Sequence, residues 1–205
     1  MKSATPKPRP YRQGARAEAA ESTGRSIVEA FVDRIMRQWY DEITLDLIAR
    51  DAGVTVQTVV RRFGGKEGLL GEAVKVLSAQ IEDARRASTG DLTASVDGLV
   101  RDYERTGDAI IRLLSLEPRH KALSTFLNTG RGYHRARVAT IASESLAALT
   151  PAERERALDA LVIATDVYTW QLLRRDMKRS IPATAAAMTR LVKATIHEYT
   201  TGVQR

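Results

Sequence analysis

The feature that most constrains this chain is the segment Thr44–Phe63, in which two short helical patterns flank a single glycine. Thr44 can cap a helix over residues 45–51, and Thr55 can cap a second helix that ends at Phe63. Gly53 lies between them and tolerates the left-handed backbone of a tight turn. Two short helices joined in this way can cross so that the second lies in the major groove of DNA. The segment therefore predicts a helix-turn-helix.

Apolar spacing divides this segment into two faces. The inward positions, which can pack against an amphipathic helix over residues 25–40, are Leu47, Ile48, Val54, Val59 and Phe63. On the outward face, Gln57 can pair with adenine through two hydrogen bonds, and Val56 can contact a thymine methyl group. Hydroxyl and Arg side chains suit phosphate groups. The remaining outward residues of the second helix are Thr55, Thr58, Arg61 and Arg62.

Charge is concentrated at the beginning of the chain. The protein has 32 Lys and Arg residues against 25 Asp and Glu, a formal charge of +7. Five of the basic residues and no acidic residue fall in the first 16 positions, which also contain several prolines. We predict a flexible basic arm over residues 1–22, which either contacts DNA or acts as a solubilising tail.

Composition favours an all-α protein, because Ala, Leu, Arg and Glu are frequent and strand-forming residues are sparse. We expect about nine helices, divided between a helix-turn-helix domain over residues 23–66 and a helical domain over residues 67–205. Thr150-Pro151-Ala152-Glu153 has the spacing of a capping box and begins a helix that we expect to run to Met177. Other helices are predicted at 92–105, 107–116, 119–128, 131–149 and 182–199.

Cysteine is absent and no apolar run approaches the roughly 20 residues that span a bilayer. Disulfides and thiolate metal sites are therefore excluded, and we predict a cytoplasmic protein with no membrane partner, no cofactor and no metal.

The stretch Thr44–Leu70 resembles the N-terminal domain of the tetracycline-repressor (TetR) family. The resemblance rests on Ile48-Ala49, Ala52-Gly53-Val54-Thr55, Thr58 and Phe63-Gly64-Gly65-Lys66-Glu67-Gly68-Leu69-Leu70. It implies an all-α homodimer with a DNA-binding head and a divergent ligand-binding core. It also implies that Thr44 and Lys66 contact phosphates and that residues 55–58 face the groove. Members of this family usually have Tyr where this chain has Val60.

From the pattern and the resemblance together we predict a ligand-responsive repressor that binds a palindromic operator as a homodimer. The expected DNA-binding residues are Thr44, Thr55, Val56, Gln57, Thr58, Arg61, Arg62 and Lys66.

The helix after Thr150 and the last helix both carry long apolar stripes, which predict a four-helix contact between two copies of the chain. The expected interface residues are Leu158, Leu161, Val162, Thr165, Met188, Leu191, Val192 and Thr195. The alternative is a larger core within a single protomer.

An unknown small-molecule effector would bind in the central helices, where we expect Tyr103, Phe126 and Trp170 to line its pocket. His134 lies among Arg131, Arg135 and Arg137, and we interpret this cluster as a solvated basic face.

Two other functions are compatible with parts of the sequence. An enzyme is disfavoured, because the chain has three His and no Cys, and because Gly64-Gly65-Lys66 is followed by Glu67 where a phosphate-binding loop needs Ser or Thr. A helical adaptor that has lost DNA binding is the second alternative, and Val60 is the residue that motivates it.

Overall fold

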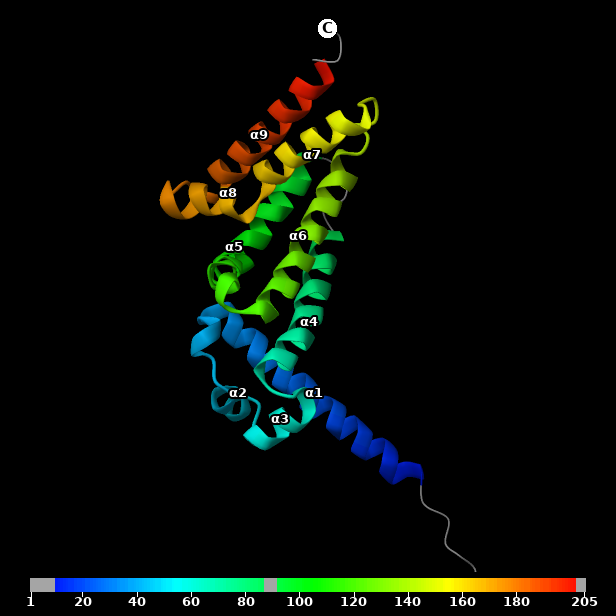
Figure 1. The fold of residues 1–205 in the computed structure, drawn as a ribbon, viewed down its shortest axis with the longest axis vertical. Coiled ribbons are helices and arrows are strands. Elements are labelled where there is room, and N and C mark those ends of the chain that lie inside the picture. The colour runs from blue at the N-terminus through cyan, green and yellow to red at the C-terminus, as the bar shows by residue number, and fades with distance from the viewer. Residues whose placement is uncertain (1–9, 87–91, 202–205) are drawn as a thin grey trace, which may run out of the picture.

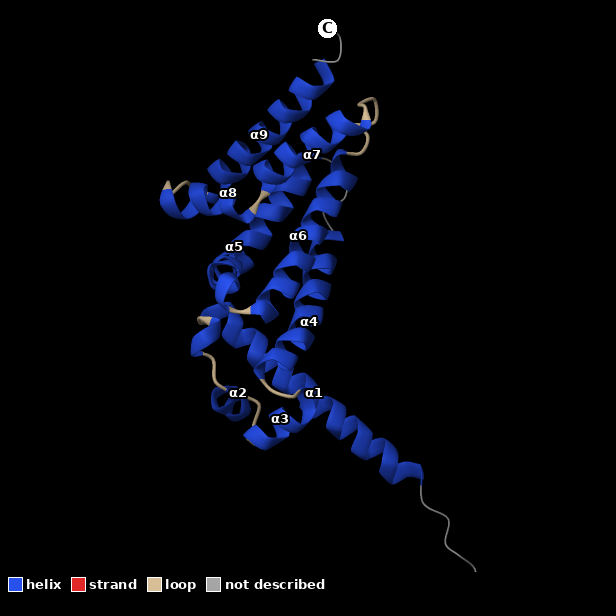
Figure 2. Ribbon diagram, in the orientation of Figure 1, coloured by secondary structure: helices blue, strands red, loops and turns tan. Residues whose placement is uncertain are grey.

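The structure is a computed structural model that describes residues 10–86 and 92–201, and every regular element in those ranges is helical (Figures 1 and 2). The all-α prediction of about nine helices is confirmed. Within the same ranges, no helix combines the length and apolar character needed to cross a membrane. The α-helices are α1 (Pro10–Arg37), α2 (Leu45–Asp51), α3 (Val56–Phe63), α4 (Lys66–Arg86), α5 (Leu92–Leu116), α6 (Lys121–Ala142), α7 (Pro151–Thr165), α8 (Val167–Gln171) and α9 (Ile181–Thr201).

Helix α1 begins earlier than the sequence analysis expects. Residues 10–22, assigned there to a flexible arm, are helical, while residues 1–9 lie outside the described part of the chain. The Ala-rich stretch over residues 15–20 has high helix propensity, and Pro10 occupies the first helical position, where its missing N–H costs nothing. At its other end α1 stops at Arg37, and Tyr40–Glu42 form a separate 3-10 turn, η1.

Two hydrophobic clusters hold the molecule together. The first contains Phe31 of α1 and Val59 of α3, together with the beginning of α4. The second contains Leu161 of α7 and Met188 of α9. Helices α5 and α6 run between the two ends of the molecule (Figure 1) and contribute side chains to both clusters. The same two helices therefore form part of the support for the predicted helix-turn-helix and part of the C-terminal core.

Helices α5 and α6 are each continuous where the sequence analysis predicts a break. Gly107, at the predicted break in α5, is buried, and a Cβ there would overlap the ring of Trp170. Its role is therefore to let an aromatic ring approach the helix backbone. Gly130 and Gly132 lie exposed in α6, which tolerates them at about 1 kcal/mol each relative to Ala. Helix α6 ends at Ala142 rather than residue 149.

The capping box at the start of α7 is confirmed. The Glu153 amide donates to the Thr150 hydroxyl at 3.4 Å, and the Glu153 carboxylate accepts from the Thr150 amide at 3.0 Å. The predicted helix to Met177, however, is broken at Asp166. Its backbone is extended, and its carboxylate accepts from the Tyr168 amide at 2.9 Å, so Asp166 caps α8 as a new helix.

The break at Asp166 places Trp170 against α5. The Trp170 indole nitrogen donates to the Glu104 carboxylate at 2.8 Å, and Arg174 binds the same carboxylate at 2.6 and 3.0 Å. The hydrogen bond from Arg174, with a further bond from Trp170, holds the pKa of Glu104 below its ordinary value. Asp108, about one turn further along α5, forms two 2.9 Å hydrogen bonds with Arg175. Four charged side chains and the Trp170 indole thus fasten the region after the break to α5.

Candidate nucleic-acid interface

The turn between α2 and α3 has the geometry that its residues predict. The Thr44 hydroxyl accepts from the Leu47 amide at 3.3 Å, and the Thr55 hydroxyl accepts from the Thr58 amide at the same distance. Gly53 has a φ of +66°, a left-handed conformation that favours glycine. The predicted bounds of both helices are confirmed to within one residue.

The inward face of this unit is anchored on α1 and α4. Ile48 and Val59 are fully buried in the first hydrophobic cluster, and Ala49 is buried where α2 and α3 approach each other. Val54 and Phe63 are half-buried against this cluster. Leu47 is half-buried but is not among the residues that pack against the cluster, where Leu45 takes the inward position instead. Replacing a buried Leu or Ile by Ala typically lowers the free energy of unfolding by about 2–5 kcal/mol. Packing of these side chains in the core therefore fixes the orientation of α3.

The outward face of α3 carries most of the residues expected to contact DNA. Gln57, Arg61 and Arg62 are exposed, as is Thr55, while Val56 and Thr58 are half-buried. The Thr55 and Thr58 hydroxyls lie 3.0 Å apart, so one donates to the other. Val60, at the position usually taken by Tyr in TetR proteins, is 43% exposed on the same helix. The surface therefore offers an amide, hydroxyls and guanidinium groups, which are the groups that read base edges and bind phosphates.

Arg62 differs from Arg61 in that its side chain folds back over α1. A Cβ on Gly24 would overlap the Arg62 guanidinium group, and that group lies 5.8 Å from the centre of the Phe63 ring. Gly24 thus leaves the space that the guanidinium occupies.

Lys66 is placed differently from the expected phosphate contact. Its ammonium group donates to the backbone carbonyls of Tyr40 at 2.5 Å and Ile43 at 2.8 Å, and lies 4.2 Å from the centre of the Tyr40 ring. Burial lowers the pKa of Lys66 and raises that of the Tyr40 hydroxyl to about 12. In this structure the Lys66 side chain therefore fastens the start of α4 to η1.

The contacts of Lys66 also show that Gly64-Gly65-Lys66 does not have the geometry of a phosphate-binding loop. Gly64 and Gly65 follow helix α3, not a strand, and the Lys66 ammonium is engaged by two carbonyls. A nucleotide-binding loop follows a strand and directs its Lys at the phosphates. The Gly64-Gly65-Lys66 segment here is a helix C-cap, with Gly64 at a φ of +75°.

The three residues expected to line an effector pocket are core residues instead. Tyr103 is buried and donates to the Thr165 carbonyl at 3.1 Å, and Trp170 is fully buried against Gly107. Phe126 packs at the edge of the first cluster, near the helix-turn-helix. Large aromatic side chains supply much of the apolar area in a core, which explains their positions here.

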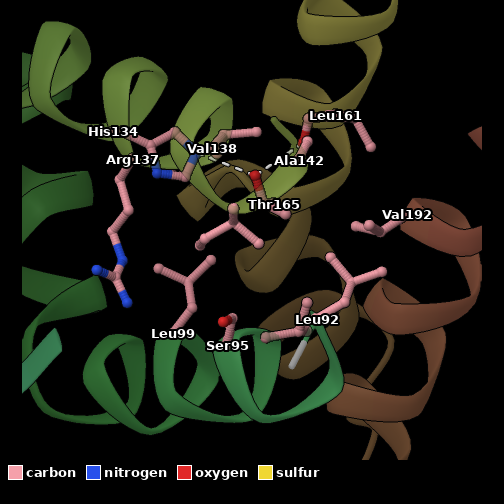
Figure 3. A pocket seen from close by; sticks show the side chains of 12 residues that line it. Leu92, Ser95, Leu99, His134, Arg137, Val138, Ala142, Leu161, Thr165 and Val192 are labelled. Atoms are coloured by element: carbon pink, nitrogen blue, oxygen red, sulfur yellow. Dashed lines mark hydrogen bonds between the residues drawn. The ribbon is translucent and has the colours of Figure 1, made fainter. Parts of the chain in front are cut away.

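A cavity does lie in the C-terminal core, between α5, α6, α7 and α9 (Figure 3). Sequence reasoning missed it because two of its polar side chains, His134 and Arg137, come from the segment interpreted as a solvated basic face. Arg131 and Arg135 do form surface ion pairs, with Glu117 and with Glu155 and Asp159. The apolar lining residues are Leu92, Val96, Leu99, Val138, Ile141, Ala142, Leu161 and Val192, and the polar ones are Ser95, His134, Arg137 and Thr165.

Most of the residues predicted to contact a second copy face the protomer's own core. Leu158, Leu161, Thr165, Met188 and Val192 are all buried. The apolar stripes of α7 and α9 are real, but they pack on each other and on α5. Val162 and Thr195 are half-buried, and Leu191 is 48% exposed, so only these three of the predicted set are accessible.

The structure thus combines a helix-turn-helix in α2 and α3 with a set of helices, α5, α6, α7 and α9, that enclose a cavity. Residues 28–73 match the family model described as "Bacterial regulatory proteins, tetR family". Residues 28–73 thus carry a DNA-binding domain of the TetR type, as found in bacterial regulatory proteins.

A solved protein structure has a similar fold. A candidate transcriptional regulator from Pseudomonas aeruginosa PAO1 is similar with a TM-score of 0.68 and 16% sequence identity, over 86% of this chain and 91% of that one. No curated protein matches the sequence.

Proposed function

We propose that this protein is a ligand-responsive repressor that binds a palindromic operator as a homodimer. The observation that carries the proposal is the placement of α5 and α6. Both helices line the cavity at one end and contact the helix-turn-helix domain at the other, so a ligand in the cavity can act on the DNA-binding domain through them.

The contacts at the DNA-binding end of these helices are specific. Arg112 of α5 donates to the Met36 carbonyl at 2.8 Å, at the C-terminal end of α1. His120, at the start of α6, packs edge-on against Tyr40 with ring centres 5.4 Å apart. The Tyr40 carbonyl in turn accepts a hydrogen bond from the Lys66 ammonium group. A shift of α5 or α6 would therefore move α1, η1 and the start of α4.

Such a shift changes repression only if the ligand binds one arrangement better than the other. Two recognition helices must reach successive major grooves, so a small rotation of each head domain changes the fit to both half-sites at once. The coupling is reciprocal: a ligand that weakens DNA binding is itself bound more weakly by the DNA complex.

A second copy of the chain is the partner that the exposed apolar residues favour. Among the described residues, eight large apolar side chains are exposed, and six of them lie in the region of α7, α8 and α9. Exposed apolar residues concentrated in one part of a chain mark an interaction surface. The six are Ile163, Tyr168, Leu172, Met177, Ile181 and Leu191.

The proposal is tested by selecting genomic DNA fragments with the purified protein and sequencing those that bind. We expect an inverted repeat whose half-sites are separated by one helical turn of DNA or a multiple of it. A variant carrying Gln57→Ala and Arg61→Ala, both on the exposed face of α3, serves as the matched control and should enrich nothing. Failure of the native protein to enrich any sequence would instead support the adaptor.

A further inference from the structure

Val60 is an exposed apolar side chain on a helix whose other exposed residues are polar. It is 43% exposed, and the remaining exposed residues of α3 are Gln57, Arg61 and Arg62. Helix α3 lies at the end of the molecule opposite α9 (Figure 1). Removing apolar surface from water is favourable, so a partner that covers this face of α3 gains most at Val60 if it brings an apolar group there.

The two valines on successive turns of α3 have different surroundings. Val56 is half-buried and packs against the first hydrophobic cluster, next to the fully buried Val59. Val60 is not among the described residues that pack against either cluster. The side chain of Val56 is thus partly used within the protomer, whereas that of Val60 is available to a partner. An apolar contact with a base, which the sequence analysis expects from Val56, therefore fits Val60 better.

The position of Val60 on α3 places it beside the residue expected to read a base. Residues three and four apart on a helix are neighbours on its surface, so Val60 and Arg61 both adjoin Gln57. Three residues rise about 4.5 Å along a helix axis, and base pairs stack about 3.4 Å apart. A base that Val60 reaches is therefore within about two base pairs of the base that Gln57 reaches.

The major groove of DNA offers one apolar group at its base edges, the C5-methyl group of thymine. A valine side chain has two methyl groups and no hydrogen-bonding atom, so it matches that group and none of the polar ones. We propose that Val60 contacts the C5-methyl group of a thymine within about two base pairs of the adenine that Gln57 reads. The inference rests on the proposed function, because it assigns a specificity-determining residue to the same DNA-binding surface.

The test replaces single thymines of a selected operator by deoxyuridine, which lacks the C5-methyl group and keeps every hydrogen-bonding group of the base. Binding of the full-length protein to each DNA is measured by fluorescence anisotropy. We expect one position in each half-site at which the replacement weakens binding about fourfold, the effect of leaving one methyl-sized group unburied. If no thymine of the operator shows such a loss, the inference is wrong.

Two valine variants assign the contact to one residue. In Val60→Ala the loss at the sensitive position should fall below about twofold, because the shorter side chain no longer reaches the methyl group. Val56→Ala is the matched control, the same change one turn earlier on α3, and it should keep the full loss. Sensitivity that persists in Val60→Ala and disappears in Val56→Ala would return the contact to Val56. If Val56→Ala does not fold, the result for Val60→Ala decides.

A methyl group on a different base gives an independent measurement. Replacing the sensitive thymine by cytosine, with guanine opposite, removes the methyl group and changes the hydrogen-bonding groups, so binding should weaken. Using 5-methylcytosine at that position restores the methyl group alone. It should recover about fourfold in affinity for the native protein and none for Val60→Ala. If Val60 only supports the structure of α3, the native protein will bind the two cytosine operators equally, which would contradict the inference.

These measurements separate the inference from the proposed function. Selective binding to an operator with no sensitivity to any thymine methyl group would refute the contact of Val60 and keep the regulator. Methyl sensitivity that depends on Val60, at a site without an inverted repeat, would keep the contact and refute the palindromic operator. A native protein that enriches no DNA sequence would refute both.

Discussion

At the scale of single residues, two basic side chains close in sequence have different surroundings. Arg61 extends from the exposed face of α3, whereas Lys66 is engaged by the carbonyls of Tyr40 and Ile43. The sequence predicts a phosphate contact for both residues. Residue type and spacing do not show that the Tyr40 and Ile43 carbonyls lie within hydrogen-bond distance of the Lys66 ammonium group. We therefore expect Arg61 to contact DNA and Lys66 to hold the start of α4 to η1.

This separation predicts different effects of two substitutions. Arg61→Ala should weaken binding to all DNA sequences and lower the log–log slope of affinity against salt by about 0.9, the value for one phosphate contact. Lys66→Met should lower the free energy of unfolding by about 1–3 kcal/mol, because it leaves two carbonyls without their donor, and should not change the slope. Fluorescence anisotropy at several salt concentrations and urea unfolding measure the two quantities. A reduced slope for Lys66→Met would return Lys66 to the DNA interface.

Gln57 is the residue from which we expect direct reading of a base. Gln57→Ala should relax the preference at one operator position, with a loss of about 1–3 kcal/mol for the favoured base and little change for other DNA. Binding to operators with all four bases at each position tests this. If the pattern of preference stays the same, another residue of α3 reads the base.

At the scale of elements, local signals and tertiary contacts determined different parts of the structure. The caps at Thr44, Thr55 and Thr150 involve neighbours within three residues, and they were predicted correctly. In α5, Gly107 lies against Trp170, 63 positions away in the chain, a contact that no local pattern contains. The break at Asp166 is a local cap that the prediction of one helix to Met177 missed.

Glycine substitutions in two helices test that account. Gly107→Ala should destabilise the protein by about 1–3 kcal/mol, because the added methyl group displaces the Trp170 ring, although Ala regains part of this through helix propensity. Gly132→Ala is the control, since nothing lies within 4 Å of its Cβ position, and it should stabilise by about 0.5–1 kcal/mol. Urea unfolding followed by Trp fluorescence measures both. If Gly107→Ala instead raises the free energy of unfolding, the Trp170 ring can move aside without destabilising the protein, and this account is wrong.

The ionic contact between α5 and the region after Asp166 should make stability depend on pH. The pKa of Glu104 is lowered in the folded protein, chiefly by its hydrogen bond with Arg174. Its stabilising contribution is therefore fully present above the unfolded-state pKa of about 4.3 and is lost as pH falls through the lower folded-state value. Glu104→Gln should cost about 1–3 kcal/mol at pH 7 and progressively less in acid, where the native carboxylate also loses its charge. Urea unfolding of both proteins at pH 7 and below pH 4 tests this, and a constant difference would contradict it.

At the scale of the whole molecule, the sequence located the helix-turn-helix but not the cavity or the accessible apolar face. A helix-turn-helix is specified by contacts within about twenty residues, so its faces follow from the local pattern. The stripes of α7 and α9 have the same periodicity whether they face α5 or a second copy, and five of the eight predicted interface residues pack on the protomer's own core. The cavity depends on four helices that are distant in sequence.

The proposed dimer predicts the behaviour of a charged double variant. Ile163→Asp with Leu191→Asp should convert a dimer to a monomer, because burying two unpaired carboxylates in each subunit's contact is unfavourable. Trp39→Asp changes an exposed apolar residue of the N-terminal domain and should leave the assembly unchanged. Light scattering coupled to size-exclusion chromatography measures the mass. A native protein that elutes as a monomer, or a double variant that remains a dimer, would refute this interface.

The Arg62 side chain lies over Gly24 of α1, in space that a larger residue at position 24 would fill. The position of one guanidinium on the recognition helix depends on a residue of α1 that belongs to neither helix of the motif. Transplanting α2 and α3 alone into a related scaffold with a larger residue at that position would redirect Arg62. Exchange of operator preference between such proteins therefore requires the matching residue of α1 to be transferred along with the motif.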